Sequence, residues 1–194
     1  MTLNIEPTVS EAPYEREVAL RDLIEALDLP DRRLTTSELE KVALAVAARP
    51  DLFEDLVVAD EESRWWLLLY KTEAFEVKLL TWERDQSSDW HDHGGSSGVF
   101  AVTAGTLVER HRASDAVGIE SSRFDAGSFG SFGPDHVHDV VFGSGKPAVS
   151  IHAYSPPLVG LTYYEHTPFG FVAREFVPEE VRSGRRTTQP SPRD

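Results

Sequence analysis

The chain contains no cysteine among its 194 residues. This absence excludes disulfides, thiolate metal ligands, iron–sulfur clusters and cysteine nucleophiles. Any metal site must therefore use histidine, aspartate or glutamate side chains. Such donors suit a borderline or harder divalent ion, of which Fe(II), Zn, Mn and Ni are examples.

Positive charge and long apolar runs are also scarce. Only 19 Lys and Arg accompany 33 Asp and Glu, which gives a formal net charge of −14. A chain this acidic repels phosphate backbones and anionic lipid surfaces, so we expect no nucleic-acid and no membrane binding. No stretch approaches the roughly 18 consecutive apolar residues of a membrane span, and no signal-peptide pattern opens the sequence. We therefore expect a cytoplasmic protein.

Apolar residues with a helical period occupy the N-terminal part of the chain. They predict a helix over Tyr14–Leu27 and a second helix that Thr36 or Ser37 caps and that ends before Pro50. Residues 51–57 predict a short third helix.

From Ser63 onward the period changes to that of strands, punctuated by glycine, proline and aspartate. Gly105 predicts the turn of a hairpin. Many short strands joined by turns are typical of an antiparallel sandwich or barrel. The strand-like runs are Trp65–Tyr70, Phe75–Trp82, Gly98–Val102, Thr106–Arg110, Val140–Phe142 and Ala148–Tyr154.

The chain is long enough for one domain with a full core. We expect the barrel to cover residues 63–181 and a helical N-terminal region, residues 1–62, to pack on it. Residues 182–194 contain no apolar side chain other than proline and predict a disordered tail.

Two histidines separated by one residue, His91 and His93, form the most informative motif. Alternate residues of a strand share a face, so both imidazoles can reach one metal ion. A second His-x-His pair at the start of another strand offers a third ligand, either His136 or His138. Solvated surface histidines are the alternative interpretation of such pairs. The histidines that stand singly in polar surroundings, and that we expect on the surface, are His111 and His166.

Ser150, His152 and Tyr154 share one face of a strand whose other face is apolar. Two interpretations are open. The row is either the solvated side of an antiparallel sheet or a set of hydrogen-bonded side chains that looks into the barrel.

Together these motifs resemble the cysteine dioxygenase type I family of thiol dioxygenases, within the cupin superfamily. The resemblance implies a mainly β fold: a cupin-type antiparallel β-barrel (jelly-roll) with a small α-helical N-terminal region. It also implies an Fe(II) cofactor and, as substrates, O2 and a small thiol whose sulfur becomes a sulfinic acid. The resemblance runs from about Arg64 to Pro157, and its anchors are Phe75–Trp82, His91–Gly98, Gly105, Val137–Val140 and Pro147–Pro157.

Residue by residue, the resemblance implies a metal held by His91, His93 and His138, with His136 as the second choice. Three neutral imidazoles leave the ion its full charge for a substrate thiolate. The resemblance also implies a hydrogen-bonded catalytic triad with its tyrosine hydroxyl beside the open metal positions. The members of that triad are Ser150, His152 and Tyr154.

Gly98 stands where many cupins place a glutamate ligand. In the animal members of the family the same position holds a cysteine that is crosslinked to the pocket tyrosine. The glycine agrees with a site of three histidines and excludes the crosslink. The chain is therefore similar to the bacterial type.

The arginine that meets the substrate carboxylate in the family is missing here, because its position reads Leu68 or, one register off, Leu67. Lys78 is a candidate substitute, since it and Trp82 lie on the strand face that lines the family's pocket. The alternative is a lysine in solvent paired with Glu76. Two further cations, at strand ends where we expect solvent exposure, are Arg64 and Lys71.

Phe142 stands where cupins usually carry an asparagine. Together with Trp65, Trp66 and Leu68, this ring predicts a more apolar site than a cysteine dioxygenase needs. The substrate is therefore open to thiols other than cysteine, among them 3-mercaptopropionate, cysteamine and larger thiols.

The sequence thus predicts an Fe(II)-dependent thiol dioxygenase. Its alternatives are a cupin metallohydrolase or isomerase that uses Zn, Mn or Ni, and a catalytically silent cupin that binds a metabolite. The oligomeric state is left open.

Overall fold

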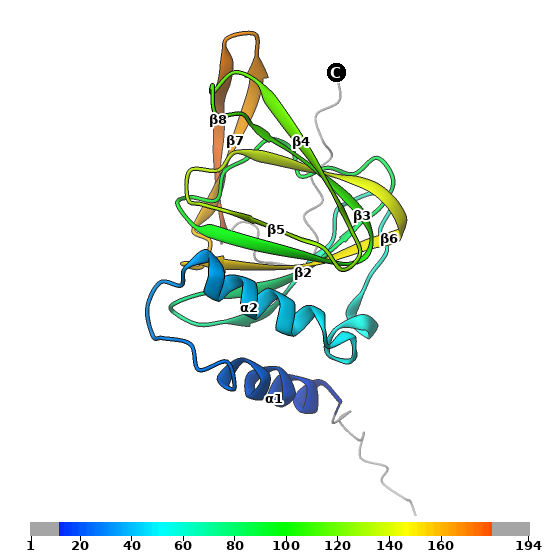
Figure 1. Cartoon of the computed structure of the whole chain (residues 1–194). Helices are drawn as coiled ribbons and strands as arrows, with labels where there is room; N and C mark the ends of the chain where they lie inside the picture. The colour runs from blue at the N-terminus through cyan, green and yellow to red at the C-terminus, as the bar shows by residue number, and fades with distance from the viewer. Residues whose placement is uncertain (1–11, 180–194) are drawn as a thin grey trace, which may run out of the picture.

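The computed structural model describes residues 12–179 of the chain (Figure 1). The expected disordered tail, residues 182–194, lies outside the described residues. Helices come first in this part of the chain and strands follow. In order, the elements are α1 (Ala12–Glu25), α2 (Thr36–Ala47), the 3-10 helices η1 (Pro50–Leu52) and η2 (Glu54–Leu56), β1 (Trp66–Lys71), β2 (Glu76–Trp82), β3 (Ser97–Arg112), β4 (Ile119–Asp125), β5 (Phe129–Phe132), β6 (His138–Ser155), β7 (Gly160–Thr167) and β8 (Gly170–Pro178).

Both α-helices lie on one side of the strands, with α2 between α1 and the sheet (Figure 1). Helix α2 begins one residue earlier than predicted, because its N-cap is Thr35 rather than Thr36 or Ser37. The Thr35 side chain accepts a hydrogen bond from the Glu38 backbone N–H, and the Glu38 carboxylate accepts one from the Thr35 backbone N–H at 2.8 Å. This reciprocal capping box satisfies two backbone donors that the helix leaves unpaired. None of the described helices is long and apolar enough to span a membrane.

The predicted third helix over residues 51–57 is instead two single 3-10 turns, η1 and η2. They meet at Phe53, which ends η1 and begins η2. The Phe53 side chain is buried in the core between the helices and the sheet. The buried Phe53 ring, at the break between the two turns, therefore anchors the segment that leads to β1.

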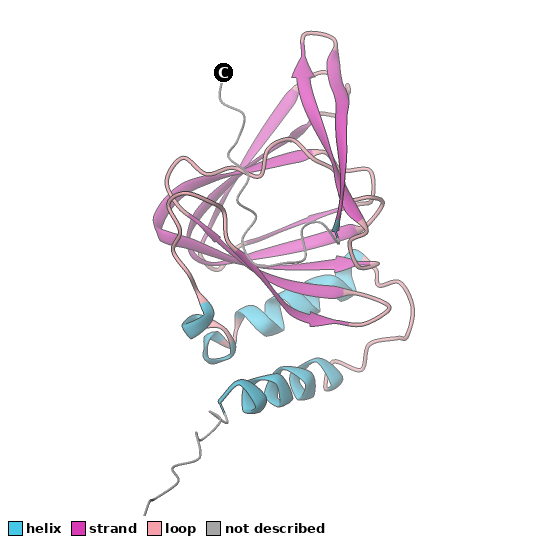
Figure 2. Cartoon of the chain, turned by 180° about the vertical axis from the view of Figure 1, so that it is seen from behind, coloured by secondary structure: helices cyan, strands magenta, loops and turns pink. Residues whose placement is uncertain are grey.

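The strands form a six-stranded sheet in the order β1-β2-β6-β3-β4, with β5 paired to β3, and a separate hairpin of β7 and β8. Each of these pairs is antiparallel. Figure 2 shows the curved strands wrapped around a common interior, with the helices outside it. The prediction of a mainly β, antiparallel fold is confirmed.

The predicted hairpin turn at Gly105 is wrong. β3 continues through this residue, and its partner β6 likewise joins two runs that the sequence predicts as separate strands. Gly105 has a φ of +71° and lies among register shifts between Val102 and Leu107. A Cβ there would lie 2.4 Å from the Ser144 carbonyl oxygen. The glycine therefore serves a bulge that bends a long strand.

Alternation along β2 separates two apolar cores. Val77 and Leu79 face the helices and belong to the core between helices and sheet. Leu80 and Trp82 belong to a second core inside the curved sheet. β6 pairs with β2 over residues 148–154, so its alternate side chains divide in the same way.

Candidate metal centre

The segment that carries the first two histidines is held by backbone hydrogen bonds on both sides. The N–H of His91 donates to the His138 carbonyl at 2.9 Å, and the N–H of His138 donates back to His91 at 3.0 Å. On the other side, Asp92 donates from its backbone to the Thr162 carbonyl of β7 at 3.0 Å. The Asp92 side chain also turns toward β7, where it accepts a hydrogen bond from the Tyr164 hydroxyl at 2.8 Å. The histidines on either side of Asp92 consequently point the other way.

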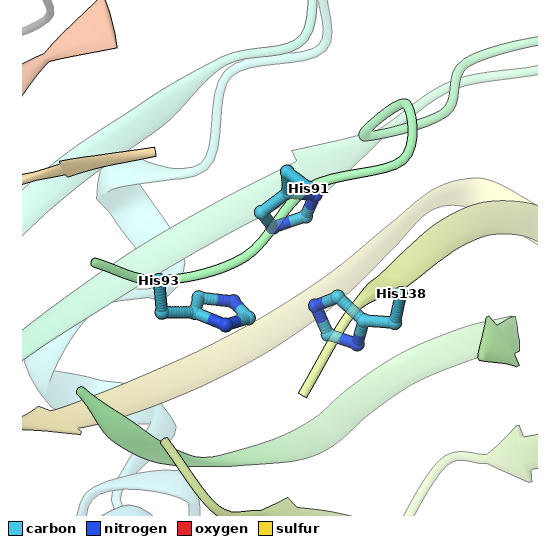
Figure 3. A group of neighbouring side chains, drawn as sticks. All are labelled: His91, His93 and His138. Carbon is cyan, nitrogen blue, oxygen red and sulfur yellow. The ribbon is translucent and has the colours of Figure 1, made fainter. Parts of the chain in front are cut away.

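The structure brings His91, His93 and His138 together, and Figure 3 shows the three rings converging from two segments. Their ring centroids lie 4.8, 4.8 and 4.9 Å apart. Each ring offers a nitrogen within 4.8 Å of the others, and all three residues are buried. His136 does not join this group, because its Nε2 lies 2.9 Å from Oε1 of Glu109.

Hydrogen bonds determine which ring nitrogen of His91 and of His138 is available to a metal ion. The Nδ1 atom of His91 lies 2.8 Å from the Asp89 carbonyl oxygen, which can only accept, so this nitrogen carries the proton. The Nδ1 atom of His138 lies 2.7 Å from Oε1 of Glu109. In both rings Nε2 is then the unprotonated nitrogen with a lone pair for a metal ion.

Glu109 is ionised in this arrangement. Burial raises its pKa, but hydrogen bonds from His136 and His138 outweigh burial and hold the pKa of this carboxyl at about 2. Glu109 carries no motif in the sequence, since it lies in the middle of a strand and far along the chain from either histidine. Its place beside His138 depends on how β3 pairs with β6.

His93 provides the test of whether a metal fits this site. Both of its ring nitrogens are buried and lack a hydrogen-bond partner among the described residues. The ring stacks between Phe132 and Tyr154, at centroid distances of 4.4 and 5.5 Å. Burial, followed by the neighbouring histidines, lowers the pKa of His93 well below its usual value, so the ring is neutral. A buried neutral imidazole with an unsatisfied lone pair fits a divalent metal ion, and three such donors suit Fe(II) or Zn.

The polar row on β6 faces inward and is hydrogen-bonded. Ser150 Oγ lies 2.9 Å from Nε2 of His152, and Nδ1 of His152 lies 3.0 Å from the Tyr154 hydroxyl. Trp82 extends the row, because its indole N–H donates to Ser150 Oγ at 2.9 Å. Since all three residues of the row are buried, the solvated alternative is excluded. Burial lowers the pKa of His152 to about 3, and the charges of nearby cations act in the same direction.

A small cavity adjoins these groups. The space in it that is open to the centre of a water molecule is about 30 Å³. Two of the three metal-site histidines, His91 and His138, lie in its wall beside His152 and Tyr154. The other lining residues are Arg64, Trp66, Lys78, Leu80, Trp82, Ser88, Val140, Leu158 and Leu161.

Lys78 lines the cavity and is only 4% exposed, so the alternative of a lysine in solvent is wrong. The predicted pairing with Glu76 is present, with Nζ to Oε1 at 2.9 Å. Nζ also pairs with Glu179, which the sequence did not suggest. The ammonium group lies 4.6 Å from the centre of the Trp66 ring.

Arg64 is half-buried rather than exposed, contrary to the expectation from its position. Its guanidinium stacks on Trp82 at 5.2 Å and donates from Nη1 to the Ser87 carbonyl at 3.1 Å. Lys71 does have an exposed side chain and pairs with Oε2 of Glu76 at 3.4 Å. Of these two cations at strand ends, the cavity therefore contains Arg64 alone.

A family model described as cysteine dioxygenase type I matches residues 16–167. The chain belongs to the cysteine dioxygenase type I family. Its strand order fits the cupin-type jelly-roll, although the sheet is not closed into a complete barrel over the described residues. No curated protein sequence matches the chain.

Several solved structures resemble this member of the cysteine dioxygenase type I family over about half of its length. TT1209 from Thermus thermophilus is 20% identical, with a TM-score of 0.47 over 54% of this chain and 93% of its own. KdgF from Halomonas sp. is 15% identical, with a TM-score of 0.45 over 54% and 89%. A cupin-2 domain containing protein from Shewanella frigidimarina is 17% identical, with a TM-score of 0.41 over 52% and 85%.

The two candidate positions for the family's arginine, Leu68 and, one register off, Leu67, both hold a leucine on β1. Leu68 lies opposite Lys78 in the β1–β2 ladder, is 42% exposed and does not line the cavity. Phe142 and Trp65 also lie outside the cavity wall, since the first packs in the inner core and the second against the helices. Of the four residues expected to make the site apolar, Trp66 alone is in the wall of this cavity.

Packing explains why position 98 is a glycine in this cysteine dioxygenase homologue. A Cβ at this position would lie 2.3 Å from the Phe132 ring and 3.0 Å from the Tyr154 ring. Either a glutamate or a cysteine here would therefore displace the ring that stacks on His93.

His166 lies away from the three converging histidines, whereas His111 lies opposite His138 in the β3–β6 ladder, with its ring centroid 5.5 Å from that of His136. His166 is exposed and bonds through Nε2 to the Val117 carbonyl oxygen at 3.0 Å. His111 is half-buried, 3.9 Å from the Glu120 carboxylate. Neither joins the two groups of possible metal ligands in the described part of the chain.

Proposed function

We propose that this chain is an Fe(II)-dependent thiol dioxygenase that adds both atoms of O2 to the sulfur of a small thiol. The reaction balances as a thiol plus O2 giving a sulfinic acid, in which sulfur loses four electrons and O2 gains them. One observation carries the proposal: three buried imidazoles converge beside the Tyr154 row in a chain of this family.

His91, His93 and His138 would hold the metal. When bound there, Fe(II) would supply the positive charge that favours a thiolate and the redox chemistry that a thiol and O2 require. The protein contributes donors that are already oriented, since Asp89 and Glu109 fix the protons of two rings on Nδ1. No carboxylate needs to bind the ion directly.

The row on β6 orients the Tyr154 hydroxyl. An indole N–H can only donate, so Ser150 accepts from Trp82. The two ring nitrogens of His152 join Ser150 to the Tyr154 hydroxyl, and the tautomer of His152 sets the direction of both hydrogen bonds. We propose that Tyr154, held in this way at the cavity wall, contacts the substrate and manages a proton.

The cavity restricts the substrate to small molecules. Leu80, Val140, Leu158 and Leu161 supply apolar wall, and the open space of about 30 Å³ leaves little room. We propose that Lys78 and Trp82 contact the part of the substrate that lies away from its sulfur. A small thiol fits this space better than a large one.

Oxygen uptake tests this proposal directly. Protein loaded with Fe(II) without oxygen is mixed with air-saturated buffer and a panel of small thiols, and both oxygen and sulfinate are measured. We expect uptake with at least one thiol, no uptake in His93→Ala, and a reduced rate in Tyr154→Phe. The same protein loaded with Zn provides the control, since Zn has no redox chemistry.

Zn chemistry is the second candidate, because three imidazoles that leave a position for water also form a Lewis-acid site. The metal bound after purification distinguishes the two. Zn without iron, together with no thiol-dependent uptake after iron loading, favours a hydrolase or isomerase. Iron with tight ligand binding but no turnover favours the silent binding protein.

A further inference from the structure

Glu76, Lys78 and Glu179 form a buried charge cluster at the wall of the cavity. Their exposed fractions are 1%, 4% and 9%. Nζ of Lys78 pairs with Oε1 of Glu76 at 2.9 Å and also with Oε1 of Glu179. Glu179 follows β8 and is held in place by its backbone N–H, which donates to the Val159 carbonyl at 3.0 Å. The two carboxylates thus reach one ammonium group from opposite parts of the chain.

Lys78 is the cavity cation on the Tyr154 side. Its Nζ lies 6.0 Å from the centre of the Tyr154 ring. Arg64 lies toward the other end, since it stacks on Trp82, four residues further along β2. At about 3.3 Å per residue that separation along the strand is about 13 Å. A substrate beside Tyr154 therefore meets Lys78 first.

The charge of Lys78 is already compensated. One ammonium faces two carboxylates, and the exposed Lys71, which lies 3.4 Å from Oε2 of Glu76, brings the four charges to zero. A substrate carboxylate that binds Lys78 would either lie beside Glu76 and Glu179, which repel it, or displace Glu179 and leave that carboxylate buried without its partner. An amine or an uncharged group requires no displacement.

We infer that Glu179 determines the charge of the substrate, so that this site selects small thiols without a carboxylate. The inference rests on the proposed function and names its substrate class. Lys78 lines the cavity and Glu179 pairs with it, so Glu179 neutralises the charge that would attract a substrate carboxylate. Without the negative charge of Glu179, Lys78 would offer a charge-assisted hydrogen bond to such a carboxylate.

Binding to Zn-loaded protein tests the inference without turnover. Titration calorimetry compares three thiols of similar size: cysteamine, 2-mercaptoethanol and 3-mercaptopropionate. Wild type should bind the first two at least about tenfold more tightly than 3-mercaptopropionate, and Glu179→Gln should gain about tenfold for 3-mercaptopropionate. Glu175→Gln is the matched control, because it removes a carboxylate from an exposed position on β8 and should leave the order of affinities unchanged.

Two further variants keep the test decisive. Glu179→Asp retains the charge and should keep the wild-type preference even if Glu179→Gln fails to fold. In the double variant Lys78→Met/Glu179→Gln, the gain for 3-mercaptopropionate should disappear, because the cation is gone. Equal binding of 3-mercaptopropionate and 2-mercaptoethanol by wild type, or no gain for 3-mercaptopropionate in folded Glu179→Gln, overturns the inference. Thiols that bind with this selectivity but never support oxygen uptake with Fe(II) overturn the proposed function instead.

Discussion

Oε1 of Glu109 accepts a hydrogen bond from Nδ1 of His138 at 2.7 Å, and this contact leaves Nε2 of His138 to bind a metal. The carboxylate is buried and ionised, so it also increases the electron density that the ring can offer. In the proposed metal site, Glu109 therefore orients the ligand His138 and makes it a stronger donor.

Glu109→Gln should weaken metal binding by about 10- to 100-fold, the range typical of such carboxylate partners. A neutral amide oxygen can still accept from the histidines but cannot supply the negative charge. Competition with a chelator measures the affinity for Zn or Fe(II). Glu120→Gln, an exposed carboxylate on β4, is the control, and equal affinities in the two variants would show that Glu109 does not act on the metal.

Metal binding should stabilise the folded protein, because it provides a partner for one of the two buried nitrogens of His93. At a metal concentration about 100 times the Kd, the gain is about 2.7 kcal/mol, which raises Tm by several degrees. Calorimetric melting with and without metal measures this shift. His93→Ala should abolish the shift and His166→Gln should retain it; a shift that survives in His93→Ala would place the metal elsewhere.

The stability of the metal-free protein should fall in mild acid. Burial lowers the pKa of His152 from 6.5 to about 3. Between these two pH values the unfolded chain binds a proton at His152 and the folded protein does not. The contribution of His152 is therefore fully present above pH 6.5 and is lost as pH falls toward 3, at about 1.4 kcal/mol per pH unit. The lowered pKa values of His93 and Glu109 act in the same direction.

Urea unfolding at a series of pH values in this range isolates the part due to His152. His152→Gln cannot take up the proton, so its free energy of unfolding should decline less steeply with falling pH than that of wild type, by about one proton. Parallel declines would mean that His152 is protonated in the folded protein.

Gly98→Ala should destabilise the protein by about 1–3 kcal/mol, because the new Cβ would lie 2.3 Å from the Phe132 ring. Displacement of Phe132 also disturbs the stacked His93, so metal affinity should fall in the same variant. Gly133→Ala is the matched control, since a Cβ there meets nothing within 4 Å. Denaturant unfolding and metal titration give both quantities, and similar behaviour of the two variants would contradict the packing argument.

Local patterns sufficed for the features that depend on neighbours in sequence. The spacing of His91 and His93 places both on one side because Asp92 alternates outward, and the alternation at Ser150, His152 and Tyr154 likewise appears in the structure. The row on β6 is a consequence of strand geometry. His91 and His93, predicted on a strand, instead lie in a segment outside the named strands, which isolated bridges at His91 join to both neighbours.

Features that depend on distant partners could not be read from the sequence. Gly105 looks like a turn, and only the pairing of β3 with β6 makes it a bulge. β4 was missed because its side chains are mostly exposed and polar, so it lacks an apolar alternation. The burial of Lys78 depends on Glu179, which is 101 residues away and carries no motif. Which of His136 and His138 lies beside His91 and His93 also depends on distant partners. His138 lies there, and Nε2 of His136 instead contacts Glu109.

The origin of the product oxygens tests the central claim most directly. Fe(II)-loaded protein is allowed to react with a small thiol under isotopically labelled O2, and the sulfinate is examined by mass spectrometry. A thiol dioxygenase places both labelled atoms in each sulfinate molecule, and His93→Ala should form none of this product. A sulfinate with one labelled atom or none, or the absence of product while iron is bound, would contradict the account.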